Sequence, residues 1–334
     1  MISSYNFFYT SSYRNLSEFT SDKANRYDVF ISAYTEEDSV RSTFEQSDAF
    51  KKIWIVLPEY GYDSSHTFID REYYRNDDVN SEAEFINQFF DKYKLDLVGK
   101  NVCIDITGFV KPYIIYFLFK LRYEGFESVE FIYTEPQAYE KKSETVFSIS
   151  SSSIVVRNIF TYDSFVQASN EDDLCLINVG YDFNLVSKVV SDLNVREKKV
   201  LLGFPSLQAI MYQENVINLD KSKSLLNIES IEEVLYSPAN NPFLTAKVIS
   251  NYVEDYTKKH SKISNIYLSP LATKPQAIGM AIFYIFEFKK YMERDISIHI
   301  RYPFTKGYSS SAGKGVFRVN KYVIDFKLFD SLVT

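Results

Sequence analysis

The sequence predicts an α/β protein made of two tandem units, each built on a mainly parallel sheet. Two observations carry this prediction. Short, nearly continuous apolar runs alternate with segments of helical periodicity, which is typical of parallel sheets covered by helices on both faces. The same order of runs then occurs twice along the 334 residues, a length that allows two domains of ordinary size. We therefore predict two Rossmann-like units, residues 1–150 and 151–334, related by internal duplication.

In the first unit, the predicted strands are the apolar runs at 28–33, 53–58, 101–107 and 129–134. Helical patterns at 36–46, 81–94 and 113–126 separate them. Pro112 stands at the start of the third helix, where proline is favoured because its missing N–H needs no partner there. This alternation predicts parallel strands joined by helical crossovers.

In the second unit, the predicted strands are 174–179, 199–205, 265–270 and 296–303, with helices at 184–193, 243–259 and 275–292. Polar residues near 140–172 mark the boundary between the units, and one extended segment, 153–160, lies among them. A comparable extended segment, 315–326, ends the second unit.

The two halves match at their turns. The matched positions are Tyr34 with Tyr181, Pro58 with Pro205, Lys111-Pro112 with Lys274-Pro275, and Tyr139 with Tyr308. The interval from Tyr34 to Pro58 also has the same length as the interval from Tyr181 to Pro205. Duplication explains this pattern, and coincidence between two segments rich in strands and helices is the alternative.

Composition and charge narrow the class of function. The net charge is −7 and the isoelectric point about 5.2, which argues against non-specific coating of nucleic acid. Cys103 and Cys175 lie in apolar runs without CxxC spacing, so neither a disulfide framework nor a zinc site is predicted. No secretory signal pattern and no membrane-length apolar run occur, so we expect a cytoplasmic protein that does not enter membranes.

The segment DITGFVKP at 105–112 carries the strongest ligand signal. It places a strand, Thr107, Gly108 and Lys111 directly before a helix, and a helix N-terminus with a lysine favours phosphate. Ligands of open parallel sheets bind beyond the carboxyl ends of the strands, where this turn is expected. Neither a Walker A motif nor a GxGxxG motif is present.

DITGFVKP and SPLATKP both resemble the Thr-Gly-Gly-Thr-Lys turn of CRISPR-associated Rossmann-fold (CARF) ligand-sensor domains. Thr107, Gly108 and Lys111 match in the first copy, and Thr273 and Lys274 match in the second, where Leu271 and Ala272 replace the glycines. The resemblance implies that the two copies hold the phosphates of a cyclic oligonucleotide in a common site. Two solvated first-turn lysines, each followed by proline, are the alternative.

The segment YDVFISAYTEED at 27–38 is similar to the first strand and turn of TIR domains. Some TIR domains hydrolyse NAD with a glutamate in a later helix, and Glu82 and Glu84 lie in a comparable region. The alternative is that both are first-turn carboxylates that complement the helix dipole.

Several carboxylates are predicted near strand ends. Asp105 and Glu135 are candidate catalytic acid/base residues, and Asp182 is a candidate ligand-binding residue. A structural role for Asp105 is equally consistent, because a buried carboxylate needs donors. The three could hold magnesium, but their spacing does not demand it, and we predict no metal site. His66, His260 and His299 have no partner in a recognisable triad motif.

We therefore predict binding of a nucleotide-like or other anionic small ligand, by a sensor or accessory factor, with bacterial antiviral defence implied by the two resemblances. Lys111 and Lys274 would hold phosphate, Thr107 and Thr273 would offer hydroxyls, and Tyr34 and Tyr181 would stack on the base. The predicted ligand-binding residues are Tyr34, Thr107, Gly108, Lys111, Tyr181, Asp182, Thr273, Lys274, Tyr308 and Ser309. A nucleotide or NAD hydrolase and a protein-interaction scaffold without a small ligand are the alternatives, and the sequence names no cofactor.

Overall fold

The computed structural model describes residues 5, 8–63, 71–139, 154–161, 166–169, 171–180, 182–193, 195, 197–208, 211–214, 216–217, 219, 234–305, 307–308 and 313–333. The chain forms two compact units. The seven-stranded unit comprises Phe7–Ser150 and Lys306–Thr334, and the six-stranded unit comprises Met1–Asn6 and Ser151–Thr305. The chain thus passes between units at 6/7, 150/151 and 305/306, and its last segment belongs with the seven-stranded unit rather than with 151–305.

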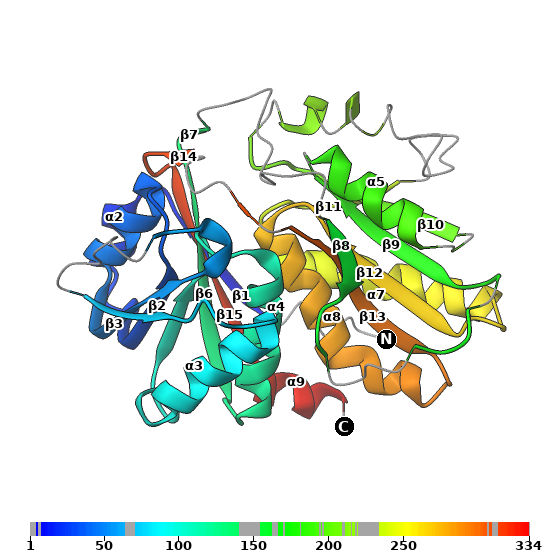
Figure 1. The fold of residues 1–334 in the computed structure, drawn as a ribbon, viewed down its shortest axis with the longest axis horizontal. Coiled ribbons are helices and arrows are strands. Elements are labelled where there is room, and N and C mark those ends of the chain that lie inside the picture. Colours follow the sequence, from blue (N-terminus) through cyan, green and yellow to red (C-terminus); the bar gives the residue numbers. More distant parts are fainter. Residues whose placement is uncertain are drawn as a thin grey trace. The chain divides into compact units, whose positions relative to one another are not determined.

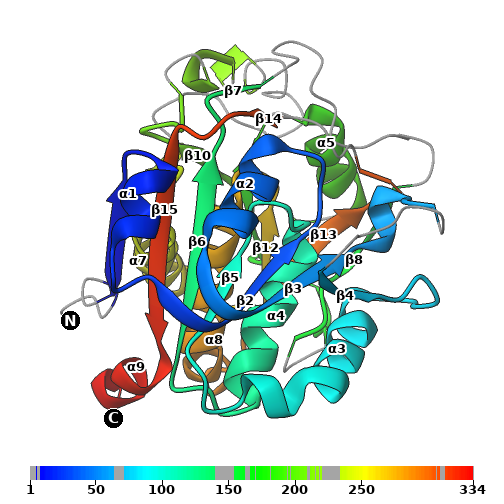
Figure 2. The same cartoon turned by 90° about the vertical axis from the view of Figure 1, so that its left-hand side faces the viewer.

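The seven-stranded unit has the strand order β1-β15-β6-β5-β2-β3-β4. Its strands are β1 (Tyr9–Tyr13), β2 (Arg26–Ala33), β3 (Asp48–Val56), β4 (Glu72–Arg75), β5 (Val102–Asp105), β6 (Ser128–Glu135) and β15 (Arg318–Asp325). Strands β2 to β6 are parallel, whereas β15 runs antiparallel to both β6 and β1. Figure 2 shows β15 in red beside β6.

The helices of this unit are α1 (Leu16–Ser21), α2 (Asp38–Gln46), α3 (Glu82–Leu97), α4 (Lys111–Tyr123) and α9 (Phe326–Val333), with a short 3-10 helix, η2 (Pro58–Tyr60). A small two-stranded ribbon pairs β7 (Ala138–Tyr139) with β14 (Gly313–Lys314). Side chains of α1 and α2 pack with Phe30 and Trp54 in one apolar cluster. Aromatic residues of α3 and α4 pack with Tyr74 in another.

The six-stranded unit has the strand order β11-β10-β9-β12-β13-β8. Its strands are β8 (Val155–Asn158), β9 (Leu174–Val179), β10 (Glu197–Gly203), β11 (Leu235–Ser237), β12 (Asn265–Pro270) and β13 (Ser297–Phe304). All are parallel except β8, which pairs antiparallel with β13. The helices are α5 (Phe183–Asp192), α7 (Pro242–Lys259) and α8 (Lys274–Met292) (Figure 1).

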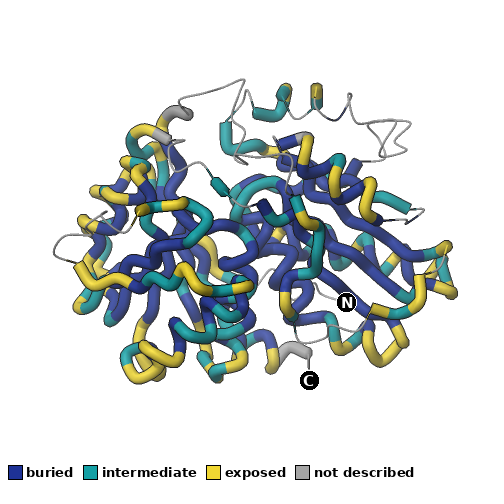
Figure 3. The backbone as a smooth tube through the Cα atoms, in the orientation of Figure 1, coloured by how far each residue is buried: buried dark blue, intermediate teal, exposed yellow. Residues whose placement is uncertain are grey.

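Both sheets arrange their five parallel strands in the same order. In each, the first parallel strand lies between the second and the fourth, the third lies beyond the second, and the fifth lies beyond the fourth and pairs with an antiparallel strand. The seven-stranded sheet has β1 in addition. Strands β9 and β12 are buried at every residue (Figure 3), as expected for a sheet with helices on both faces. The predicted α/β fold with two Rossmann-like, mainly parallel units is confirmed, and the shared topology supports the predicted duplication.

The antiparallel strands are exchanged between the halves of the sequence. Strand β8 follows β6 along the chain but pairs with β13, and β15 follows β13 but pairs with β6. The predicted extended segments 153–160 and 315–326 therefore contain strands that complete each other's sheet. This exchange is why Lys306–Thr334 groups with the seven-stranded unit.

No helix in the described part of the chain is both long enough and apolar enough to cross a membrane.

Candidate functional site

The candidate site lies at the carboxyl end of the seven-stranded sheet. From β2 the chain moves to β3 on one side, and it later returns to form β5 on the other side of β2. The order of strands thus reverses between β2 and β5, and α/β sheets bind ligands beyond the strand ends at such a point. Residues that follow β2, β3 and β5 form the surroundings of this position.

Asp105, the last residue of β5, is fully buried and accepts hydrogen bonds from several donors. The hydroxyl of Ser32 in β2 donates to Oδ2 at 2.9 Å. The amide and the hydroxyl of Thr107 donate to Oδ1 at 3.0 and 2.5 Å. A buried carboxylate is costly without such donors. Asp105 therefore ties the turn after β5 to the end of β2.

Thr107 continues this network. Its hydroxyl accepts a hydrogen bond from the amide of Thr134 in β6 at 2.9 Å. The Thr134 hydroxyl in turn lies 3.1 Å from that of Thr43 in α2. The Thr107 hydroxyl, predicted to contact a ligand, is thus engaged with the fold on both its donor and acceptor sides.

Gly108 allows two turns to touch. A Cβ atom at this position would lie 2.0 Å from the carbonyl oxygen of Ala33 at the end of β2. In the six-stranded unit the corresponding contact has its glycine on the other turn, because a Cβ at Gly180 would lie 2.7 Å from the carbonyl oxygen of Leu271. SPLATKP lacks the glycine that this contact needs. Gly180, in the turn after β9, supplies it from the other side of the contact.

A tyrosine cluster, which we define as Tyr34, Tyr60 and Tyr62, surrounds the same strand ends. The ring of Tyr34 meets those of Tyr62 and the buried Trp54 edge-on, with centroids 5.2 and 5.3 Å apart. The ring of Tyr60 is 6.2 Å from that of Tyr62, and its hydroxyl donates to the Gly108 carbonyl at 2.7 Å. Desolvation and then the carboxylate of Glu37 raise the pKa of Tyr60.

Glu59, Lys111 and Tyr308 complete the surroundings. Oε1 of Glu59 accepts a hydrogen bond from the hydroxyl of Tyr113 at 2.8 Å, and the Glu59 carbonyl accepts one from the amide of Tyr308 at 2.9 Å. Lys111, the first residue of α4, is partly exposed, and Pro112 follows it at the predicted helix start. Tyr34, Thr107, Gly108, Lys111 and Tyr308 are therefore all in the seven-stranded unit near one end of its sheet.

The sequence had not singled out Tyr60, Tyr62 or Glu59. Their segment, PEYGYD, follows the second parallel strand, where a residue that contacts a ligand is expected. Two features of the sequence could have pointed to these residues: their position after a strand, and the spacing of Tyr60 and Tyr62, which are two residues apart.

In the six-stranded unit, Asp182 and Thr273 are helix N-caps. Asp182 accepts a hydrogen bond from the amide of Asn184 at 3.2 Å at the start of α5. Thr273 accepts one from the amide of Gln276 at 3.3 Å, and its hydroxyl donates to the Ala239 carbonyl at 2.5 Å. Both caps satisfy amides that a helix start leaves open. Lys274 is the partly exposed first residue of α8.

Glu135, the last residue of β6, is buried. Its Oε1 accepts a hydrogen bond from Nδ2 of Asn320 in β15 at 2.7 Å. Burial raises the pKa of the Glu135 carboxyl, and the hydrogen bond from Asn320 opposes this shift. Catalytic roles for Glu135 and Asp105 stay predictions.

Four candidates remain. Tyr181 and Ser309 lie outside the described residues. Glu82 and Glu84 are in the first turn of α3, whose N-cap is Ser81. Among the described residues, no group of three or more His, Cys, Asp or Glu side chains could hold a metal ion.

No protein-family model, curated protein or solved structure matches this chain. The resemblances to CARF and TIR domains therefore stay predictions.

Proposed function

We propose that the protein binds a nucleotide-like small molecule at the carboxyl end of the seven-stranded sheet, as a sensor or accessory factor. The observation that carries this proposal is the gathering of Tyr34, Tyr60, Tyr62 and Lys111, from three separate loops, around the β2–β5 switch point. Aromatic rings accept nucleobases of any sequence by stacking.

Each part of a nucleotide has a candidate partner here. Tyr34 is half-buried, and we propose its ring as the stacking partner of the base. Lys111 stands at the N-terminus of α4, where the helix dipole and a lysine together favour a phosphate. Glu59 follows the second parallel strand, the part of dinucleotide-binding folds that supplies a carboxylate to ribose hydroxyls.

The test uses Trp54, the single tryptophan of the chain, which lies 5.3 Å from Tyr34 between ring centroids. Its fluorescence is titrated with AMP, NAD and cyclic di-AMP, and thermal unfolding is followed in parallel. Binding of any of these is expected to change the emission and raise the unfolding temperature. No response to any of them in either measurement would refute the proposal.

The site is tested by a pair of lysine variants. Lys111→Ala is expected to weaken binding about tenfold or more, since a hydrogen bond to a charged group contributes roughly 1.5–3 kcal/mol. Lys100→Ala is the matched control, because Lys100 is exposed just before β5, at the opposite end of that strand. Equal affinities for the two variants would place the phosphate elsewhere. Conversion of NAD or AMP during the titration would instead support the hydrolase alternative.

A further inference from the structure

The exchange of β8 and β15 requires each strand to be directed to the correct sheet. Both strands add antiparallel to the fifth parallel strand of a unit, β13 in one and β6 in the other. The parallel strands of the two units share one order, so β6 and β13 each offer a free backbone edge to an antiparallel strand. Side chains beside these edges distinguish the two positions.

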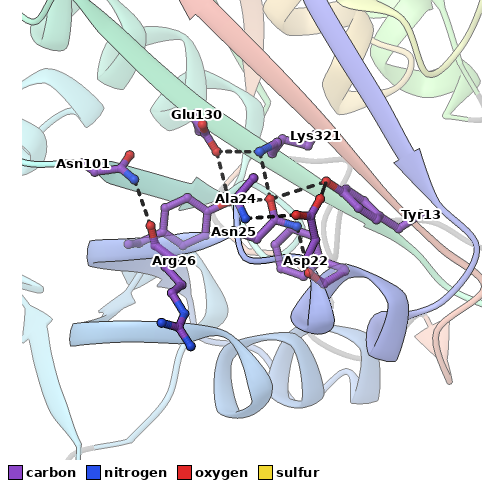
Figure 4. A network of polar contacts seen from close by, with 10 residues as sticks. Tyr13, Asp22, Ala24, Asn25, Arg26, Asn101, Glu130 and Lys321 are labelled. Atoms are coloured by element: carbon purple, nitrogen blue, oxygen red, sulfur yellow. Dashed lines mark hydrogen bonds and ion pairs between the residues drawn. The ribbon is translucent and has the colours of Figure 1, made fainter.

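Lys321 in β15 is a charged side chain without a charged counterpart at the aligned position after β8. Its side chain is 6% exposed, and its ammonium lies 3.2 Å from Oε2 of Glu130 in β6 and donates to Oδ1 of Asn25 at 2.8 Å (Figure 4). The same Oε2 atom of Glu130 accepts a hydrogen bond from the hydroxyl of Tyr27 at 3.0 Å. Nδ2 of Asn25 donates to the Phe19 carbonyl at 2.8 Å, which holds its oxygen toward the ammonium.

The equivalent position just after β8 carries no charge. The two strands can be aligned at their prolines. Glu135-Pro136 at the end of β6 then matches Tyr302-Pro303 near the end of β13. The register partners of Glu135 and Tyr302 are both arginines, Arg318 and Arg157.

Three residues beyond each arginine, the chain has Lys321 in one strand and Phe160 after the other. By the same alignment, the counterpart of Glu130 is Ser297. An ion pair in the seven-stranded unit thus corresponds to two uncharged residues in the six-stranded unit.

We propose that Glu130 and Asn25 form a strand-recognition site on the seven-stranded sheet, which accepts β15 through Lys321 and rejects β8. With Phe160 in place of the lysine, the Glu130 carboxylate would keep only the Tyr27 hydroxyl and lose its cation. Removing one partner of a largely buried pair costs far more than the intact pair contributes. Pairing of β8 with the seven-stranded sheet would thus leave the Glu130 carboxylate without a cation, and this cost makes the sheet specific for β15.

The experiment follows backbone hydrogen exchange of the full chain by mass spectrometry in Lys321→Met. The amides of β15 are expected to exchange about 30-fold faster than in the parent protein, while those of β8 do not change. The effect is smaller than for a fully buried pair because the Glu130 side chain is 19% exposed.

The matched control is Lys327→Met, which removes an exposed ion pair with Glu127 in the same C-terminal segment. This variant is expected to leave the exchange of β15 unchanged.

A double variant separates charge recognition from simple loss of packing. Lys321→Met with Glu130→Gln removes the unpaired carboxylate, so it is expected to recover most of the protection lost in Lys321→Met. Parent-like exchange in Lys321→Met would overturn the proposal, and so would a double variant no better protected than the single one. If Lys321→Met does not fold, the proposal requires the double variant to fold, and failure of both overturns it.

Discussion

The contact between Gly108 and Ala33 yields the most direct test of how the candidate site is built. In Gly108→Ala the new Cβ atom would start 2.0 Å from the Ala33 carbonyl oxygen, whereas ordinary van der Waals contact begins near 3.4 Å. Ala33 pairs with Ile55 of β3, and the next amide, Tyr34, donates to the Ile55 carbonyl at 2.8 Å. Neither side of the contact is a flexible side chain, so the end of β2 must move.

The cost follows from that movement. Overpacking contributes roughly 1–3 kcal/mol, and a weakened hydrogen bond at the strand end adds about 1 kcal/mol. We expect Gly108→Ala to lower the free energy of unfolding by about 3 kcal/mol. Urea unfolding without ligand, followed by Trp54 fluorescence, measures this selectively, because the only tryptophan is buried in the seven-stranded unit.

The control is Gly125→Ala. Gly125 has a φ of 82°, and a Cβ atom added there would have open space around it, with no contact within 4 Å beyond its chain neighbours. Alanine at this position therefore meets only the backbone penalty of about 1 kcal/mol. If Gly108→Ala destabilised the protein no more than Gly125→Ala, the close-contact argument would be wrong. Gly108 would then be better explained by a ligand that approaches its backbone.

Three further predictions concern buried groups. Burial raises the pKa of both thiols, to about 12 for Cys175. Neither cysteine should therefore react with a thiol reagent at neutral pH until urea unfolds its unit. Rapid labelling of the native protein would contradict this. Burial also raises the pKa of Glu135, so its contribution to stability is full at acidic pH and is lost as the pH rises through the folded-state pKa. Glu135→Gln should therefore raise the urea midpoint at neutral pH, with a smaller gain in mildly acidic buffer, and an equal or larger gain in acid would reverse the sign of the argument. Asp105→Asn replaces one acceptor oxygen by a donor facing Ser32 or Thr107, which should cost roughly 1–3 kcal/mol in the Trp54-monitored unfolding; an unchanged midpoint would show that the network is dispensable.

The sequence predicted the local structure of the core because that structure depends on neighbouring residues. The predicted strand 28–33 lies within β2 (Arg26–Ala33), and the predicted strand 129–134 lies within β6 (Ser128–Glu135). The prolines after Lys111 and Lys274 placed the starts of α4 and α8 correctly. Apolar periodicity and a proline at a helix start act within a few residues, so one chain suffices to recognise them.

The candidate site was predictable as a region and less so as a set of contacts. Lys111 and Tyr34 each follow a parallel strand, and this position in the sequence was enough to predict that both lie at one end of one sheet. The partners of Thr107 and Gly108 were hidden, because Thr134 and Ala33 are distant in sequence and reach them only through the pairing of β6, β5 and β2. A hydroxyl or glycine that looks available for a ligand in the sequence can therefore be engaged within the fold.

Two parallel units of one pattern could be predicted from the sequence alone, since repeated apolar runs and turns are visible without coordinates. The sheet that receives each antiparallel strand became known from the fold. The sheet that segment 318–325 joins depends on partners far away in the sequence, such as Glu130, which meets Lys321 only when distant segments fold together.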